Sequence, residues 1–123
     1  MLYAILCYND EADVSSWTKE RDDAVMEALL RVQRPLAERG KLGPVARLEA
    51  GGAARTLRKD REPFVITDGP FAETKEQILG FYLIECESGD EAMDIAQALG
   101  KANPGGAFEV RPVSFFDRGT LRA

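Results

Sequence analysis

The residues best suited to acid–base chemistry in this chain lie in two short segments, 8–10 and 68–77. The carboxylate of Asp68 could act as a general base or orient a ligand. Lys75 could stabilise a negative charge that develops on a substrate, and the hydroxyl of Tyr8 could donate a hydrogen bond to it. We therefore take Asp68, Lys75 and Tyr8 as the candidate catalytic residues.

Further residues of these segments, and two arginines elsewhere, are candidates for holding a ligand. The backbone amides of Gly69 and Phe71 could form a nest that binds an anion. The guanidinium groups of Arg47 and Arg111 could each clamp a carboxylate. The candidate ligand-binding residues are Asp10, Gly69, Phe71, Glu73, Glu76 and Arg111.

These candidates also have a purely structural interpretation. The sequence Asp68-Gly69-Pro70-Phe71 is typical of a tight turn in which the aspartate bonds its own backbone. Lys75 could simply pair with Glu76 or with an acid of another chain. Because a solvated aspartate is a weak base at neutral pH, catalysis by Asp68 requires burial or a neighbouring acid. Both interpretations are open from the sequence.

The composition excludes several kinds of chemistry. The chain contains no histidine, which removes Ser-His-Asp and Cys-His hydrolysis and His-ligated zinc. Cys7 and Cys86 lie in apolar segments, so we expect buried, reduced and unreactive thiols. The acidic side chains have no recognised metal-ligand spacing. We expect neither a metal nor a cofactor.

Length and charge indicate a single acidic domain that spans residues 1–123. The net charge is −5, which disfavours nucleic acid and anionic membranes as partners. The charge is uneven, because residues 9–23 carry six acids against two bases and residues 34–61 carry eight bases against three acids. The basic stretch could attract a small anionic metabolite, or its bases could face acids of a neighbouring segment. Since no apolar run is long enough for a leader or a membrane span, we expect a cytoplasmic protein.

Hydrophobic patterning predicts alternating strands and helices. Strands are expected at residues 2–8, 42–48, 54–59, 63–67, 80–86 and 107–113, the last at an edge because it contains Pro112. The spacing predicts a helix over residues 18–39, capped by Thr18 and kinked or broken in its last turn by Pro35. A second helix begins at the capping box Ser88-Gly-Asp-Glu91 and ends at Gly100. Residues 72–77 could add one helical turn.

This order predicts an α+β fold with a ferredoxin-like antiparallel sheet and two helices on one face. Strands 2–8 and 80–86 are apolar on both faces, so the face without helices needs a cover. We expect a homodimer in which two sheets pack face to face. In the alternative, the hairpin and the tail with Phe115 and Phe116 cover that face.

Antiparallel pairing of strand 2–8 with strand 80–86 would place the end of the first beside the start of the second. The segments 8–10 and 68–77 would then meet at one rim of the sheet. We expect the functional cleft at this rim.

The stretch from Thr67 to Glu76, followed by Gly80-Phe81-Tyr82-Leu83-Ile84, resembles the signature of the DGPF proteins in the YCII-related family. The ends of the first and last strands fit the same pattern, and the resemblance spans about residues 1–113. It implies a ferredoxin-like dimeric α+β barrel. Most members are uncharacterised bacterial proteins, and some are linked to extracytoplasmic-function sigma factors.

The resemblance implies two classes of function. A few YCII relatives are small-molecule enzymes, including a dehydrochlorinase of aromatic degradation with a suspected His–Asp active site. That pair cannot be transferred to a chain without histidine. We expect binding of a small anionic or carbonyl-bearing metabolite at the rim cleft, with proton transfer or elimination as the reaction. The alternative is a non-catalytic accessory module that acts through protein contacts.

Overall fold

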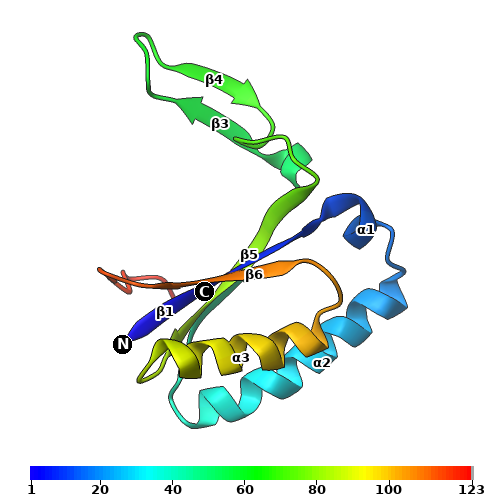
Figure 1. Cartoon of the computed structure of the whole chain (residues 1–123). Coiled ribbons are helices and arrows are strands. Elements are labelled where there is room, and N and C mark those ends of the chain that lie inside the picture. Colours follow the sequence, from blue (N-terminus) through cyan, green and yellow to red (C-terminus); the bar gives the residue numbers. More distant parts are fainter. Residues whose placement is uncertain (123) are drawn as a thin grey trace.

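The computed structural model describes residues 1–122 as a four-stranded sheet with helices on one face and a two-stranded arm (Figure 1). In chain order, the elements are β1 (Leu2–Asp10), α1 (Glu11–Ser15), α2 (Lys19–Glu38), β2 (Leu42–Arg47), the 3-10 turn η1 (Gly51–Ala53), β3 (Arg55–Arg58), β4 (Val65–Asp68), β5 (Glu76–Glu85), α3 (Gly89–Ala102) and β6 (Ala107–Pro112).

The main sheet has the strand order β2-β5-β1-β6, and all its neighbouring strands are antiparallel. This is the ferredoxin-like order that the sequence predicts, with β5 and β1 in the centre and β6 at an edge. Helices α2 and α3 pack against each other and against the same face of this sheet (Figure 1). The predicted α+β class is confirmed.

The core lies between that face and the two helices. Alternate side chains of β1 point into it, so that Ile5 is fully buried together with Ile84 of β5 and Leu99 of α3. Along α2, Val25 and Leu29 are buried on the stripe that the helical spacing predicts. The buried residues therefore repeat every second position along β1 and about every 3.6 positions along α2, and both sets pack into one core.

The register of the central pair decides which ends of the strands meet. β1 and β5 are antiparallel with Asp10 opposite Glu76, and the register shifts between Cys7 and Tyr8. The segment 8–10 therefore lies beside residues 76–78, as the pairing argument predicts.

Two local predictions are wrong. Helix α2 is not broken at Pro35 but continues to Glu38, because a proline in the last turn removes only one hydrogen bond of the ladder, and the alternative of a kink at Pro35 stays a prediction. Residues 72–77 form no helical turn: the side chain of Gln77 donates to the carbonyls of Ala72 (2.8 Å) and Thr74 (2.7 Å), and β5 already begins at Glu76. The predicted caps at Thr18 and Ser88 are both present.

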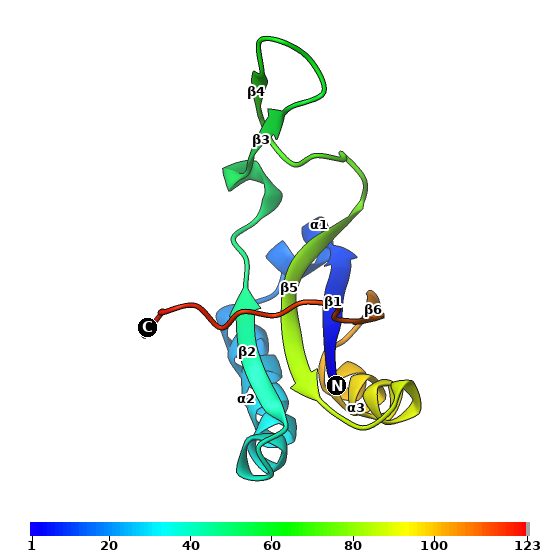
Figure 2. The same ribbon diagram turned by 90° about the vertical axis from the view of Figure 1, so that its left-hand side faces the viewer.

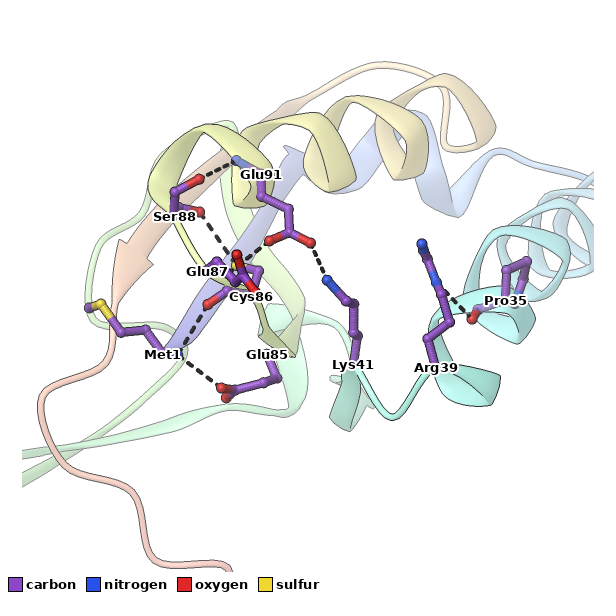
Figure 3. Close-up of polar contacts among 9 residues, drawn as sticks. All are labelled: Met1, Pro35, Arg39, Lys41, Glu85, Cys86, Glu87, Ser88 and Glu91. Carbon is purple, nitrogen blue, oxygen red and sulfur yellow. Dashed lines mark hydrogen bonds and ion pairs between the residues drawn. The ribbon is translucent and has the colours of Figure 1, made fainter.

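A polar cluster joins three segments of the chain at the end of the sheet opposite the rim (Figure 3). Ser88 accepts a 3.1 Å hydrogen bond from the amide of Glu91, and Glu91 accepts one of 2.8 Å from the amide of Glu87. The Glu91 carboxylate also pairs with Lys41, which precedes β2. The backbone amide of Glu87 beside it lowers the pKa of Glu91, and Lys41 adds to this effect. The cluster ties the start of α3 to β2 and to the loop after β5.

The second face of the sheet carries no helix. We call it the open face, and its central side chains are only half-buried in one copy of the chain: Leu2, Ala4, Leu6 and Tyr8 of β1 with Phe81 and Leu83 of β5. The chain after β6 crosses in front of the sheet in Figure 2, but the side chains of Phe115 and Phe116 remain 82% and 39% exposed. The hairpin β3–β4 projects away from the sheet instead of covering it (Figures 1 and 2).

Candidate functional site

Three of the predicted site residues lie at the rim end of the central strand pair. Tyr8 is half-buried on the open face, and its hydroxyl donates a 3.4 Å hydrogen bond to Glu109 of β6. Asp10 caps α1 by accepting a 2.9 Å hydrogen bond from the amide of Ala12. Glu76 faces Asp10 across the ladder and is exposed. The structure thus brings Tyr8, Asp10 and Glu76 to one rim.

The Asp-Gly-Pro-Phe sequence lies elsewhere, at the base of the arm. The amide of Gly69 donates a 2.7 Å hydrogen bond to Ala54, and the hydroxyl of Thr56 donates one of 2.9 Å to the Gly69 carbonyl. Gly69 has φ +101°, a conformation that favours glycine. The side chain of Asp68 is 95% exposed and lies 3.7 Å from Arg55. In this chain, the Asp-Gly-Pro-Phe segment closes the base of the hairpin.

The remaining predicted residues are on the surface of the single chain. Phe71 is 73% exposed, and the guanidinium of Arg58 lies 5.2 Å from the centre of its ring. Glu73 and Lys75 are exposed between β4 and β5. Arg111 is exposed on β6, opposite Ala4. One copy of the chain does not gather Asp68, Lys75 and Tyr8 into an enclosed site.

A cavity of about 110 Å³ lies between α2 and the sheet and reaches the rim at Tyr8 and Asn9. We call it the helix–sheet cavity. Its lining is mainly apolar and includes Trp17 from the segment before α2. The other apolar lining residues are Val14, Val25, Met26, Leu29, Val45, Ala46, Leu79 and Phe81.

The polar groups of this cavity are few and mostly neutral. Burial raises the pKa of the Cys7 thiol to about 11 and that of the Tyr82 hydroxyl to about 12. Both groups are therefore protonated at neutral pH and can donate hydrogen bonds. Gln33 and Asn9 add amide groups to the lining. The interior of the cavity suits a molecule that carries hydroxyl or carbonyl groups but little charge.

The two charged residues of the lining neutralise each other. Arg47 of β2 donates hydrogen bonds to both carboxylate oxygens of Asp22 on α2, at 2.8 and 3.3 Å. Arg47 lowers the pKa of Asp22, and Asp22 raises that of Arg47. Their side chains are 33% and 53% exposed, so the pair lies where the cavity reaches solvent. An anion that enters here must compete with Asp22 for Arg47.

From the sequence we expect the site at the rim, but most residues that line the helix–sheet cavity are not among the predicted candidates. Asp22, Gln33 and Tyr82 were not candidates, whereas Tyr8 and Arg47 were. A usable signal exists along α2: Asp22, Met26, Leu29 and Gln33 share one helix face, so two polar side chains interrupt an apolar stripe. Polar residues on an otherwise buried face mark the wall of a cavity.

Other kinds of site find no support among residues 1–122. In this part of the chain, no three acidic or cysteine side chains come together as metal ligands. No helix there is both long and apolar enough to cross a membrane. The free thiols Cys7 and Cys86 are both buried, as the sequence predicts.

The strand order, the single helix layer and the helix–sheet cavity define a ferredoxin-like α+β domain with room for a small ligand. The chain belongs to the YCII-related domain family, whose model matches residues 1–117. This confirms the family that the sequence motif indicates.

The chain is similar to one further protein in sequence and to one solved structure in fold. An uncharacterised protein of Rhizobium meliloti (strain 1021), R00369, is 57% identical over 122 residues, which is 98% of both chains. The solved structure of 5-chloro-2-hydroxyhydroquinone dehydrochlorinase (TftG) from Burkholderia phenoliruptrix AC1100, in complex with 2,5-dihydroxybenzoquinone, aligns with a TM-score of 0.52. That alignment covers 93% of this chain and 94% of TftG at 20% identity, so it shows a shared fold.

Proposed function

We propose that this protein binds a small, single-ring organic molecule in the helix–sheet cavity. The observation that carries the proposal is the cavity itself, which reaches the rim at Tyr8 and Asn9 and is lined mainly by apolar side chains. The protonated Cys7 and Tyr82 would donate hydrogen bonds to hydroxyl or carbonyl oxygens of the ligand. The complex of TftG with a dihydroxybenzoquinone is compatible with such a ligand.

A thermal-shift titration with phenol, 1,4-benzoquinone and benzoate as probes tests this function. Binding to the folded state stabilises it by about 1.4 kcal/mol at a ligand concentration near ten times Kd, which raises Tm by a few degrees. We expect phenol or the quinone to raise Tm at millimolar concentration more than benzoate does, because benzoate must displace Asp22 from Arg47.

A cavity-filling variant makes the test specific. Val45 lines the cavity but is 42% exposed, so Val45→Phe can fill the space without disturbing the buried core. We expect this variant to lose the shift in Tm. Val65→Phe, on the arm, is the matched control and should keep it. A shift that survives Val45→Phe, or no shift with any probe, would contradict binding in this cavity.

We further propose that two copies associate through their open faces. A half-buried apolar layer with no helix on it supports this arrangement, because a contiguous apolar face is commonly an interaction surface. Such a pair of sheets would also bring the rim residues of the two copies closer together.

Proton transfer or elimination at the base of the arm, where Asp68 lies, is the reaction that we propose for the assembled pair. Asp68 and Lys75 are solvated in one copy, so a second copy would have to exclude water from them before Asp68 could act as an effective base. Levulinate, which is anionic and carries a carbonyl group, is a suitable probe. The protein should accelerate exchange of its α-protons with deuterated water, measured by NMR, and Asp68→Asn should not. Equal rates with both proteins would exclude this role for Asp68.

A further inference from the structure

The connection between α1 and α2 contributes one aromatic side chain, Trp17, to the wall of the helix–sheet cavity. Trp17 is the single tryptophan of the chain, and it is half-buried against the hydrophobic core. The connection that carries it joins α1, at the rim, to the start of α2 (Figure 1). Trp17 therefore belongs to the helix layer of the cavity wall.

Hydrogen bonds on both sides of Trp17 fix its backbone. Its own amide donates a 3.1 Å hydrogen bond to the carbonyl of Val14, which closes the end of α1. The next residue, Thr18, caps α2 by accepting a 3.1 Å hydrogen bond from the amide of Arg21. Because the backbone on which the indole stands is already ordered, less conformational entropy is lost when a ligand packs against it.

The ring of Trp17 has a partner of its own on α2. The guanidinium of Arg21, about one helical turn further along the chain, lies over the ring at 5.1 Å from its centre. A cation–π contact of this kind disfavours other orientations of the indole. Arg21 occupies one face of the ring, and the rest of the indole contributes to the wall of the cavity.

A second aromatic ring reaches the same cavity from the sheet. Tyr82 of β5 is the cross-strand partner of the fully buried Ile5, so its side chain lies on the face that the helices cover. Tyr8 and Phe81 also line the cavity, but the alternation of the strands directs their side chains to the open face. The aromatic side chains that the two layers turn toward the cavity are therefore Trp17 and Tyr82.

An aromatic wall distinguishes two rings that an aliphatic wall treats alike. Two aromatic rings in contact are more stable than the burial of their area explains, and the difference corresponds to about a two- to tenfold gain in affinity. An aliphatic ring of the same size is buried equally well but lacks this gain. The aromatic residues of the cavity therefore select by the nature of the ring, and the apolar residues select only by its size.

We propose that Trp17 makes the helix–sheet cavity selective for planar aromatic rings over aliphatic rings of the same size. The ring of the ligand lies against the indole, between the helix layer and the sheet. This inference rests on the proposed function, because it names the class of molecule that the cavity binds and the residue that determines this specificity.

The first experiment compares phenol with cyclohexanol, which has a ring of the same size that is not aromatic. Both are titrated into the ¹⁵N-labelled full chain, and the shifts of its backbone amides in NMR spectra give the two dissociation constants. We expect phenol to bind the wild-type protein about two- to tenfold more tightly than cyclohexanol. The ratio of the two constants should fall at least about twofold in Trp17→Leu. Trp17→Phe keeps an aromatic ring and should restore most of the ratio.

The matched control is Met26→Leu, which changes another apolar part of the wall and keeps Trp17. Both constants are free to change in this variant, but their ratio should remain that of the wild-type protein. Circular dichroism shows whether each variant is folded. If both rings bind and the ratio is the same in wild type and Trp17→Leu, the selectivity assigned to Trp17 is overturned and the proposed function stands. If neither ring binds, both are overturned together.

The second experiment needs no substitution of Trp17. Because the chain has one tryptophan, the indole N–H gives a single resonance in the ¹⁵N spectrum. The ring current of phenol against the indole should shift this resonance with the same dissociation constant that the backbone amides report, and cyclohexanol should shift it much less. Val45→Phe, which fills the cavity, should abolish the shift. An indole resonance that stays in place while phenol binds overturns the contact with Trp17.

Discussion

Arg47 holds both carboxylate oxygens of Asp22, at 2.8 and 3.3 Å, and thereby links the edge strand β2 to helix α2 beside the cavity. Arg47 and Asp22 are 25 residues apart in the sequence, so this contact forms only when β2 and α2 come together in the folded chain. The ion pair leaves the cavity without a free charge. It therefore decides which ligands the cavity favours.

The Asp22–Arg47 pair should make stability depend on pH in the acidic range. Arg47 lowers the pKa of Asp22 in the folded state. The contribution of the pair is therefore fully present above the pKa of Asp22 in the unfolded chain and is lost as pH falls through the lower, folded value. The pair is partly solvated, so we expect Asp22→Asn to cost only about 0.5 kcal/mol at pH 7. Urea unfolding of both proteins between pH 7 and acidic pH measures the difference, which should shrink as pH falls. Asp94→Asn, at an exposed position of α3, should show no such dependence.

The wall of the helix–sheet cavity should be sensitive to the loss of side-chain volume. Leu29 is 5% exposed and lines the cavity, so Leu29→Ala should lower the free energy of unfolding by about 3 kcal/mol. Its neighbour Leu30 is 46% exposed, and Leu30→Ala should cost well under half as much. Urea unfolding compares the two variants. Equal losses would mean that α2 does not present Leu29 to the core.

The cap of α3 should contribute measurably to stability. Ser88 accepts a 3.1 Å hydrogen bond from the amide of Glu91, and we expect Ser88→Ala to cost about 1 kcal/mol. Ser88→Thr keeps the acceptor oxygen and should recover most of this loss. Thermal unfolding followed by circular dichroism measures the stability of both variants. If alanine and threonine behave alike, the cap contributes nothing at this position.

Gly69 should be required for the shape of the arm. Its φ of +101° is strained for any residue with a side chain, so Gly69→Ala should destabilise the arm by about 1–3 kcal/mol. Gly52→Ala is the control, since no atom lies within 4 Å of the added carbon there. Amide hydrogen exchange of Leu57 and Ile66 reports on the arm directly. Faster exchange in Gly69→Ala, with α2 unchanged, is the expected result, and unchanged protection would show that the turn tolerates a side chain.

Both thiols should be unreactive in the folded protein. Burial raises the pKa of Cys7 to about 11 and also raises that of Cys86, so little thiolate is present at pH 8. Ellman's reagent should therefore label neither cysteine in buffer and both cysteines in concentrated urea. Rapid labelling of the native protein would show that the cavity admits the reagent to Cys7.

The sequence by itself determined the elements and the family. The short apolar run of residues 2–8 and the helical spacing across α2 are local properties, since each depends only on the residues of one element. The capping residues Thr18 and Ser88 act on neighbouring amides, so they too can be identified without tertiary structure. The Asp-Gly-Pro-Phe motif identified the family for the same reason, because its turn chemistry is written in consecutive residues.

Only the tertiary structure decided where the candidate site lies. The motif, which suggested a base at Asp68, braces the arm instead of meeting Tyr8, because the hairpin turns away from the sheet before β5 returns to the rim. The cavity arises from α2, β1, β2 and β5 together, and no single segment predicts the gap that their packing leaves. The hydrophobic pattern of the sequence predicts which face of each element is apolar. It does not predict how closely the side chains of distant elements fit together, because that fit depends on the side-chain volumes at every contact.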